Sequence, residues 1–267
     1  MIVFFRDRFH SGPLPVNPAS PWLRHGLAVF ETLLWDRGRV VHLDRHLARA
    51  AAGLDLLGLG ALPEGLPELM AETVERNRLS GGTSRVSLYL GPETDEGPLL
   101  PLVVAEPWTV PPPEPVQLAL AEDLHLSWLA RAKTASYAPF HVATRRARAA
   151  GAWDAVLRDG EGHVLETGRA SLLFQDGEGS LVTPGTPWKL PGVAVAAVAD
   201  AEMVVEEPIL LEDLDLFPRA WVLNSLVGAL PVARLGDRTF GTDPGVTHRL
   251  RAIVLETGPG TSGLLPE

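Results

Sequence analysis

The stretch AKTASY, residues Ala132–Tyr137, decides the fold assignment because it contains one of only two lysines in this 267-residue chain. The other lysine is Lys189, and the remaining 21 of the 23 basic residues are arginines. A GC-rich genome replaces lysine by arginine over most of a protein surface, so a lysine that remains is more informative. Further along the chain, VLETG at Val164–Gly168 leads into the apolar run Ala170–Phe174.

Lys133 is the candidate catalytic residue. Burial can lower the pKa of a lysine amine, and the unprotonated amine can act as a general base or form a Schiff base with an aldehyde. The alternative is an ordinary surface lysine that follows a strand. Lys189 serves as the comparison within this chain, and we expect it to be dispensable.

Bulk properties indicate a globular enzyme and exclude several other classes. The chain is 46% hydrophobic and 21% charged, and its formal net charge of −10 disfavours nonspecific binding to nucleic acid. It has no apolar run of 18 residues, and Met1–Asp7 lacks the pattern of a signal peptide. We therefore expect a cytoplasmic protein with no membrane partner. The absence of cysteine excludes disulfides and thiol chemistry.

Strand and helix signals alternate along the chain in a way that predicts an α+β fold rather than a Rossmann or TIM arrangement. Asp44 is a candidate N-cap for the first helix, which Gly58 ends. The expected strands are 2–6, 27–35, 84–90, 100–106, 116–121, 152–158, 163–166 and 219–224. The expected helices are 43–57, 67–77, 139–150, 193–203 and 244–256.

The proline-rich stretch Pro107–Pro115 is the best candidate for a linker, since such a sequence favours an extended, semi-rigid spacer. The predicted organisation is an N-terminal α+β domain over 1–108, a linker over 109–115, a C-terminal domain over 116–258 and a flexible tail over 259–267. The arginines at 145, 146 and 148 are expected on the solvated face of a helix.

Six segments, taken in order, resemble the fold-type IV (class IV aminotransferase) family of pyridoxal-phosphate enzymes. They are His25–Thr32, Leu43–Arg49, the Lys133 segment, the Glu166 segment, Leu190–Val193 and Asn224–Val232. The family includes branched-chain aminotransferases, D-amino-acid aminotransferases and 4-amino-4-deoxychorismate lyases. The resemblance implies a small N-terminal α/β domain, a larger C-terminal pseudo-barrel domain, pyridoxal 5′-phosphate as cofactor and assembly as a homodimer.

The resemblance also implies roles for individual residues. Lys133 corresponds to the lysine that forms the Schiff base, and Glu166 to the carboxylate that keeps the pyridine nitrogen protonated. Arg49 corresponds to the phosphate-binding arginine, and Tyr137 to a tyrosine that reaches the ring oxygen of the cofactor. Each role has an open alternative. Glu166 could be an ordinary glutamate at the end of a strand, Arg49 an exposed helix arginine, and Tyr137 an ordinary buried aromatic residue.

Further family positions line the cofactor and the substrate. Gly192, Val193 and Ala194 would hold the phosphate through backbone N–H groups at a helix N-terminus, and Ser225 would also contact the cofactor. The residues expected to line the substrate are Glu31, Thr32 and Asn224, with Glu31 and Thr32 on the strand that faces it; exposure at a sheet edge would explain Glu31 nearly as well.

His42 and His46 are four residues apart but lack the glutamate and third ligand of a zinc site. We therefore expect no metal, and we expect His46 to support Arg49 or to pack structurally.

Two departures from the family pattern limit the assignment of a substrate. Val193–Ala196 replaces the Ile-Thr-Arg that follows Leu-Pro-Gly in many relatives, which removes a hydroxyl and an arginine from the phosphate segment. Val86–Gly91 lacks the arginine with which D-amino-acid aminotransferases bind the substrate carboxylate.

The leading hypothesis is a 4-amino-4-deoxychorismate lyase that forms p-aminobenzoate and pyruvate, a step toward folate, because Asn224–Val232 is closest to that group. The Ser136–Tyr137 pair is less typical of lyases. The alternatives are an aminotransferase acting on branched-chain or other apolar amino acids, and a degenerate homologue without catalysis.

Overall fold

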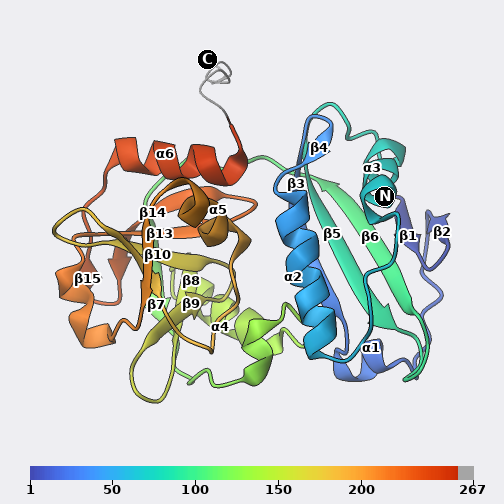
Figure 1. Ribbon diagram of the computed structural model, residues 1–267, viewed down its shortest axis with the longest axis horizontal. Coiled ribbons are helices and arrows are strands. Elements are labelled where there is room, and N and C mark those ends of the chain that lie inside the picture. Colours follow the sequence, from blue (N-terminus) through green and yellow to red (C-terminus); the bar gives the residue numbers. More distant parts are fainter. Residues whose placement is uncertain (258–267) are drawn as a thin grey trace. The chain divides into compact units, whose positions relative to one another are not determined.

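The chain divides into two compact units in the computed structural model, which describes residues 1–257 (Figure 1). Unit 1 comprises Met1–Val110 together with Ala132–Tyr137, and unit 2 comprises Pro111–Arg131 and the described residues from Ala138 onward. The predicted tail over 259–267 lies outside the described residues.

Unit 1 is built on a six-stranded antiparallel sheet in the order β2-β1-β6-β5-β3-β4. Its strands are β1 (Val3–Phe5), β2 (Arg8–His10), β3 (Val29–Asp36), β4 (Arg39–Val40), β5 (Thr83–Pro92) and β6 (Leu99–Pro107). Its helices are α1 (Pro21–His25), α2 (Leu43–Leu56) and α3 (Leu66–Arg76).

Helices α2 and α3 pack on one face of this sheet and form the core of unit 1 (Figure 1). Ala50 and Leu54 of α2 and Met70 of α3 are at most 1% exposed, and they share one apolar cluster with Leu33 and Leu88 of the sheet. The 3.6-residue spacing of apolar side chains in both helices produces this one-sided burial.

The start of α2 differs from the prediction. His42 occupies the N-cap position with φ 51°, in the left-handed region, and no side chain caps the helix there. Asp44 lies in the first turn instead, where a carboxylate still favours the positive end of the helix dipole. The prediction of Asp44 as N-cap was wrong because the chain turns into the helix two residues earlier.

Unit 2 contains a mixed sheet of nine strands that curls on itself, in the order β12-β11-β10-β13-β14-β7-β8-β9, with β15 paired to β14 (Figure 1). Its strands are β7 (Val116–Leu120), β8 (Asp154–Arg158), β9 (Val164–Thr167), β10 (Ser171–Gln175), β11 (Leu181–Pro184), β12 (Val204–Glu207), β13 (Arg219–Asn224), β14 (Gly228–Leu235) and β15 (Arg238–Thr239). Its helices are α4 (Ala138–Ala149), α5 (Val193–Ala201) and α6 (Pro244–Leu255), with 3-10 turns η1 (Trp128–Arg131) and η2 (Leu211–Leu216).

Helices α5 and α6 pack together over the centre of the unit 2 sheet. Ala194 and Val198 of α5 and Leu250 and Val254 of α6 share an apolar cluster with Trp221, whose indole N–H donates to the Thr247 hydroxyl at 2.9 Å. The pairs β7–β14, β7–β8 and β11–β12 are parallel, and the other pairs are antiparallel. The fold is therefore α+β, as the sequence predicts.

Candidate active site

The Lys133 segment is an extra strand-like piece of unit 1. Phe30 N–H donates to the Lys133 carbonyl at 2.8 Å, Ala135 N–H donates to the Ala28 carbonyl at 2.8 Å, and Thr134 forms an antiparallel bridge with Val29. Lys133 is thereby held at the start of β3 by backbone hydrogen bonds, although it is more than 100 residues away in sequence.

A glycine permits the close approach of this segment to the end of α1. Gly26 adopts φ 65° as the C-cap of α1, and a Cβ atom there would lie 2.6 Å from the Ser136 hydroxyl oxygen. Ser136 donates its hydroxyl to the His25 carbonyl at 3.0 Å. Gly26 is required both for its left-handed backbone and for the space that it leaves to Ser136.

The Lys133 amine lies over aromatic rings. Its Nζ atom is 4.5 Å from the ring centroid of Phe30 and 5.1 Å from that of Tyr137, and these two rings meet edge to face at 5.2 Å. Phe30 stacks at 5.4 Å on Tyr89, its cross-strand partner on β5, and Tyr89 stacks in turn on Trp22. Such rings stabilise an ammonium group and exclude water from one side of it.

A buried ionic cluster lies on the other face of β3. Glu31 is 1% exposed and accepts two hydrogen bonds from Arg49, from Nε at 2.8 Å and from Nη2 at 2.6 Å. His46 Nδ1 lies 2.7 Å from the same carboxylate, and the His46 side chain is fully buried. Since His46 and Arg49 are three residues apart on α2, one helix face presents both side chains to Glu31.

The charges in this cluster set the protonation states of its members. Burial by itself raises the pKa of Glu31, but the charge and hydrogen bonds of Arg49 and His46 outweigh it and lower the pKa from its ordinary 4.5 to about 2. Burial lowers the pKa of His46, and the positive charges of Arg49 and Lys133 lower it further, while Glu31 opposes them. At neutral pH the carboxylate is thus ionised and the imidazole is neutral, so Nδ1 carries the proton that Glu31 accepts.

The expectation that Glu31 and Thr32 face the substrate together needs correction. Adjacent residues of a strand point to opposite faces, and Glu31 shares the buried face of Val29 and Leu33, whereas Thr32 is half-buried on the face of Phe30. Both carboxylate oxygens of Glu31 are held by α2. Its geometry is that of a residue that positions Arg49, and a substrate-lining role stays a prediction for Glu31 and for Thr32.

Glu166 is positioned by unit 2. It is 5% exposed on β9, and its Oε1 atom accepts a hydrogen bond from the Leu190 backbone N–H at 2.9 Å. This bond ties the strand to the loop that enters α5. The Thr167 hydroxyl donates to Asp154 at 2.9 Å, and the same oxygen accepts the Ala170 N–H at 2.9 Å, which fixes the turn behind Glu166.

The start of α5 has no side-chain cap. Gly192 is its N-cap and no side chain caps the helix, while the Ala196 N–H already bonds to the Gly192 carbonyl. The preceding N–H groups of Val193 and Ala194 have no carbonyl partner within the helix, as in any first turn. A Cβ at Gly192 would lie 2.2 Å from the Ser171 hydroxyl oxygen, so a larger residue there would require the Ser171 side chain to move.

Asn224 and Ser225 form the turn between β13 and β14. The Asn224 side-chain oxygen accepts the Leu226 and Val227 N–H groups at 2.9 and 3.0 Å, and its amide donates to the Arg169 carbonyl at 3.3 Å. Ser225 is 8% exposed. The side chain of Asn224 therefore shapes the turn, and its role toward a substrate stays a prediction.

The two lysines differ clearly in setting. Lys189 forms an ion pair with Glu206 at 3.1 Å, and Glu206 is 60% exposed.

Among residues 1–257, no group of three His, Cys, Asp or Glu side chains is arranged to hold a metal ion, and no helix is long and apolar enough to span a membrane.

Sequence reasoning missed the part that Phe30, Ser171 and the Glu31 carboxylate play. The sequence predicts that Phe30 lies in a strand, but not that its ring contacts Lys133. That contact depends on the pairing of the Lys133 segment with the start of β3. The spacing of His46 and Arg49 was the available signal for the cluster, but it did not identify Glu31 as their partner.

Solved structures share this fold over nearly the whole chain. A hypothetical aminotransferase from Mycobacterium tuberculosis in its PLP-bound form superposes with a TM-score of 0.83 at 23% identity, covering 96% of this chain and 99% of that one. A branched-chain aminotransferase from Thermoproteus uzoniensis with norvaline gives 0.84 at 21% identity, covering 97% and 96%. A fold IV-transaminase from Curtobacterium pusillum gives 0.83 at 24% identity, covering 95% and 99%. No curated protein sequence matches the chain.

The family match places the chain in the class of pyridoxal-phosphate-dependent enzymes. Residues 28–235 match the amino-transferase class IV family, and the chain belongs to that family. The residues of each unit, taken by itself, suit a part of the cofactor: in unit 1 a primary amine lies among aromatic rings, and in unit 2 a helix N-terminus has no side-chain cap and a carboxylate is buried. Even without the Thr and Arg of many relatives, the backbone at Gly192–Ala194 has the geometry that binds phosphate.

Proposed function

We propose that the chain is an aminotransferase that acts on amino acids with apolar or aromatic side chains. The observation that carries this proposal is the position of the Lys133 amine over the rings of Phe30 and Tyr137. An aromatic surface beside the reacting amine favours a substrate whose side chain is apolar. The branched-chain aminotransferases among the structures that share this fold agree with such a substrate.

Lys133 is the residue to which we assign proton transfer. Its Nζ atom would take a proton from the substrate Cα and return one during the reaction, a role that requires a positioned amine. When bound, pyridoxal phosphate supplies the electron-withdrawing ring that stabilises negative charge at Cα. The Phe30 N–H donates to the Lys133 carbonyl and the Ala28 carbonyl accepts the Ala135 N–H, so the main chain from Lys133 to Ala135 is held in place while the Lys133 side chain can move.

Glu166 and Arg49 are assigned to holding the cofactor. Glu166 would keep a proton on the pyridine nitrogen, and its bond from the Leu190 N–H orients the carboxylate for that purpose. Arg49 would contact the phosphate because guanidinium groups bind phosphate, and the first turn of α5 is assigned to the phosphate for its free backbone N–H groups. In unit 1 the Nε edge of Arg49 is engaged by Glu31, which fixes the direction of the guanidinium. Tyr137 would reach the ring oxygen of the cofactor and Ser225 would contact it.

A second candidate is the 4-amino-4-deoxychorismate lyase, which Asn224–Val232 favours. In this segment the Asn224 side chain caps a tight turn and Gly228 follows with φ 72°. The aromatic rings beside Lys133 would suit the ring of that substrate equally well. A step toward folate would then be the role of the enzyme. Location in the cytoplasm and assembly as a homodimer stay predictions.

Borohydride reduction with pyridoxal phosphate, followed by peptide mass mapping, tests the shared part of both candidates. We expect a pyridoxyl adduct on Lys133 and none on Lys189, which is the matched control in the same chain. An adduct on Lys189, or none at all, would overturn the assignment and favour the degenerate homologue.

Product analysis separates the two activities. A transaminase consumes an amino acid only when a 2-oxo acid acceptor is present, whereas the lyase releases pyruvate from aminodeoxychorismate without an acceptor. Turnover of leucine or phenylalanine with 2-oxoglutarate supports the transaminase. Pyruvate release without acceptor, and no turnover of amino acids, replaces it by the lyase.

A further inference from the structure

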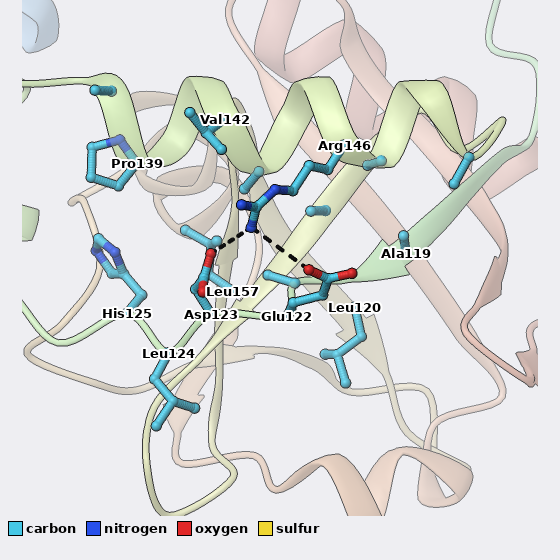
Figure 2. Close-up of a pocket in the computed structure, with 16 residues that line it drawn as sticks. Ala119, Leu120, Glu122, Asp123, Leu124, His125, Pro139, Val142, Arg146 and Leu157 are labelled. Atoms are coloured by element: carbon cyan, nitrogen blue, oxygen red, sulfur yellow. Dashed lines mark hydrogen bonds and ion pairs between the residues drawn. The ribbon is translucent and has the colours of Figure 1, made fainter.

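Unit 2 contains a cavity of about 370 Å³ between α4 and the strands β7 and β8 (Figure 2). Its walls are made by short apolar side chains from these three elements, which leave space where larger residues would meet. The short side chains are Ala119, Ala121, Ala143, Ala147 and Ala155, and Leu157 adds a longer apolar side chain to the wall. None of the residues assigned to the cofactor lines it, so this space calls for a separate explanation.

His125 is the polar side chain in the wall of this cavity (Figure 2). The residue is 7% exposed, its backbone N–H bonds to the Arg158 carbonyl at 2.9 Å, and its ring lies 4.7 Å from the ring of Phe140. The Nε2 atom is buried and has no hydrogen-bond partner among the described residues. An unsatisfied buried nitrogen is unfavourable, so a molecule that supplies the partner gains free energy on binding.

Burial also determines the charge of this ring. It lowers the pKa of His125 below its ordinary 6.5, so the imidazole is neutral at pH 7. A neutral ring can either donate or accept through Nε2, depending on its tautomer. The buried polar group of the cavity therefore calls for a hydrogen-bonding partner and not for a counter-ion.

The mouth of the cavity carries charges that already balance one another. Arg146 Nη1 lies 2.6 Å from Asp123 and 3.7 Å from Glu122 (Figure 2). Two acids against one base disfavour an anionic ligand, and both carboxylates are at least 80% exposed, where water weakens their attraction for a cation. Leu124 and Val142 add exposed apolar surface at the rim. The mouth thus suits an uncharged, largely apolar molecule.

We propose that this cavity binds a small uncharged aromatic molecule with one hydrogen-bonding group. The ring would lie between α4 and the β7–β8 strands, and the polar group would bond to His125 after a small rotation of the imidazole. The volume is at the lower end of the range for small-molecule sites, which suits one or two fused rings. The apolar walls and the single unsatisfied nitrogen are the composition expected of such a site.

Binding of 2-naphthol, with naphthalene as the matched probe that lacks the hydroxyl, tests the proposal by ligand-observed NMR on the full chain. We expect saturable binding of both and a preference for 2-naphthol. In His125→Phe the affinity for 2-naphthol should fall about tenfold, the value of one hydrogen bond, and that for naphthalene should change little. Ala143→Leu, which fills the cavity, should abolish both. Arg145→Ala, an exposed position on α4 outside the lining, should change neither.

Several results would overturn the proposal. These are the absence of saturable binding to the wild type, unchanged binding to Ala143→Leu, and equal affinity for the two probes in the wild type. A change of oligomeric state in Val142→Glu, measured by analytical ultracentrifugation, would assign the rim to an interface between copies instead. Circular dichroism of each variant shows whether it is folded, and Ala143→Ser, which keeps the cavity open, should retain binding at the position where leucine abolishes it.

Discussion

Glu31 fixes the arrangement next to Lys133, because its carboxylate holds both Arg49 and His46. Removing one partner from a buried ion pair leaves the other charge without compensation, which costs more than the pair itself contributes. Glu31→Gln keeps the shape of the side chain but removes its charge. At pH 7 we expect the free energy of unfolding to fall by about 3 kcal/mol, in line with the lowered pKa of Glu31, measured by urea denaturation.

Glu72→Gln provides the control for this substitution. Glu72 pairs with Arg76 at 2.7 Å on the surface of α3, and both side chains are 47% exposed. Water and salt weaken such a pair, so its loss should cost about 0.5 kcal/mol or less. Equal losses in the free energy of unfolding for the two substitutions would show that the buried cluster stabilises unit 1 no more than a surface ion pair does.

The same carboxylate predicts a pH dependence with a defined sign. A lowered pKa in the folded state contributes stability that is complete above the unfolded value of 4.5 and is lost as the pH falls toward the folded value of about 2. The difference between wild type and Glu31→Gln should therefore be constant near neutrality and lose more than half of its size by pH 3.

The wild type should begin to lose stability earlier, below about pH 6.5, because the unfolded chain protonates His46 while the folded chain resists it. Urea denaturation at successive pH values measures both effects. A difference between the two proteins that grows on acidification would contradict the assigned charge states.

Single residues of the site were only partly predictable. The sequence identifies Lys133, Arg49 and Glu166 as chemistry-bearing groups, because lysine scarcity and motif spacing are properties of the chain itself. The partner of Arg49 was not predictable, since the contact between Glu31 and α2 depends on how a helix is rotated about its axis on the sheet. Successive residues of an α-helix are about 100° apart, so rotating α2 by part of a turn would bring other side chains over β3, and no local signal fixes that angle.

At the scale of elements, the residue before α5, Gly192, can lie close to Ser171 because it has no Cβ atom. Gly192 has φ −73° and ψ 122°, which any residue can adopt, so space and not backbone strain requires glycine there. Gly192→Ala would drive a Cβ against the Ser171 hydroxyl and shift the first turn of α5. We expect a loss of about 2 kcal/mol in the free energy of unfolding, as in other overpacked sites, and about tenfold weaker binding of pyridoxal phosphate, measured by spectroscopic titration.

A second substitution separates this contact from other causes. Ser171→Ala removes the oxygen that the new Cβ would meet, so the double variant should recover most of both losses, a coupling expected of residues in contact. Gly177→Ala is the control within unit 2, because a Cβ there meets nothing within 4 Å. Losses in the double variant as large as those of Gly192→Ala alone would show that Ser171 is not the obstacle.

Elements with a clear period were predicted well, whereas two of the fully buried strands were not. Helices α2, α3, α4 and α6 and strands β3, β5, β6 and β13 lie within a few residues of their expected ranges. Strands β10 and β11 were not predicted, and every residue in both is buried. A strand that is buried on both faces does not alternate between apolar and polar residues, so its apolar run cannot be distinguished from a helix segment.

For the whole molecule, the path of the chain differs from the predicted order of domains. The change of unit near Val110 falls in the proline-rich stretch, where the linker was expected. Ala132–Tyr137, predicted as part of the C-terminal domain, instead returns to unit 1 and pairs with the start of β3. These six residues are held in unit 1 by hydrogen bonds to residues far away in sequence. The composition along the chain therefore does not reveal that they belong to unit 1.

Binding of pyridoxal phosphate should stabilise residues in each of the two units. The residues assigned to the cofactor are divided between them, with Lys133 and Arg49 in unit 1 and Glu166 and the start of α5 in unit 2. A ligand that binds only the folded chain stabilises it by about 2.7 kcal/mol at 100 times its dissociation constant. Pyridoxal phosphate should therefore slow amide hydrogen exchange in β3 and α2 as well as at Gly192–Ala194, while Lys133→Ala should reduce this protection. Protection confined to one unit would contradict the assignment of residues in the other.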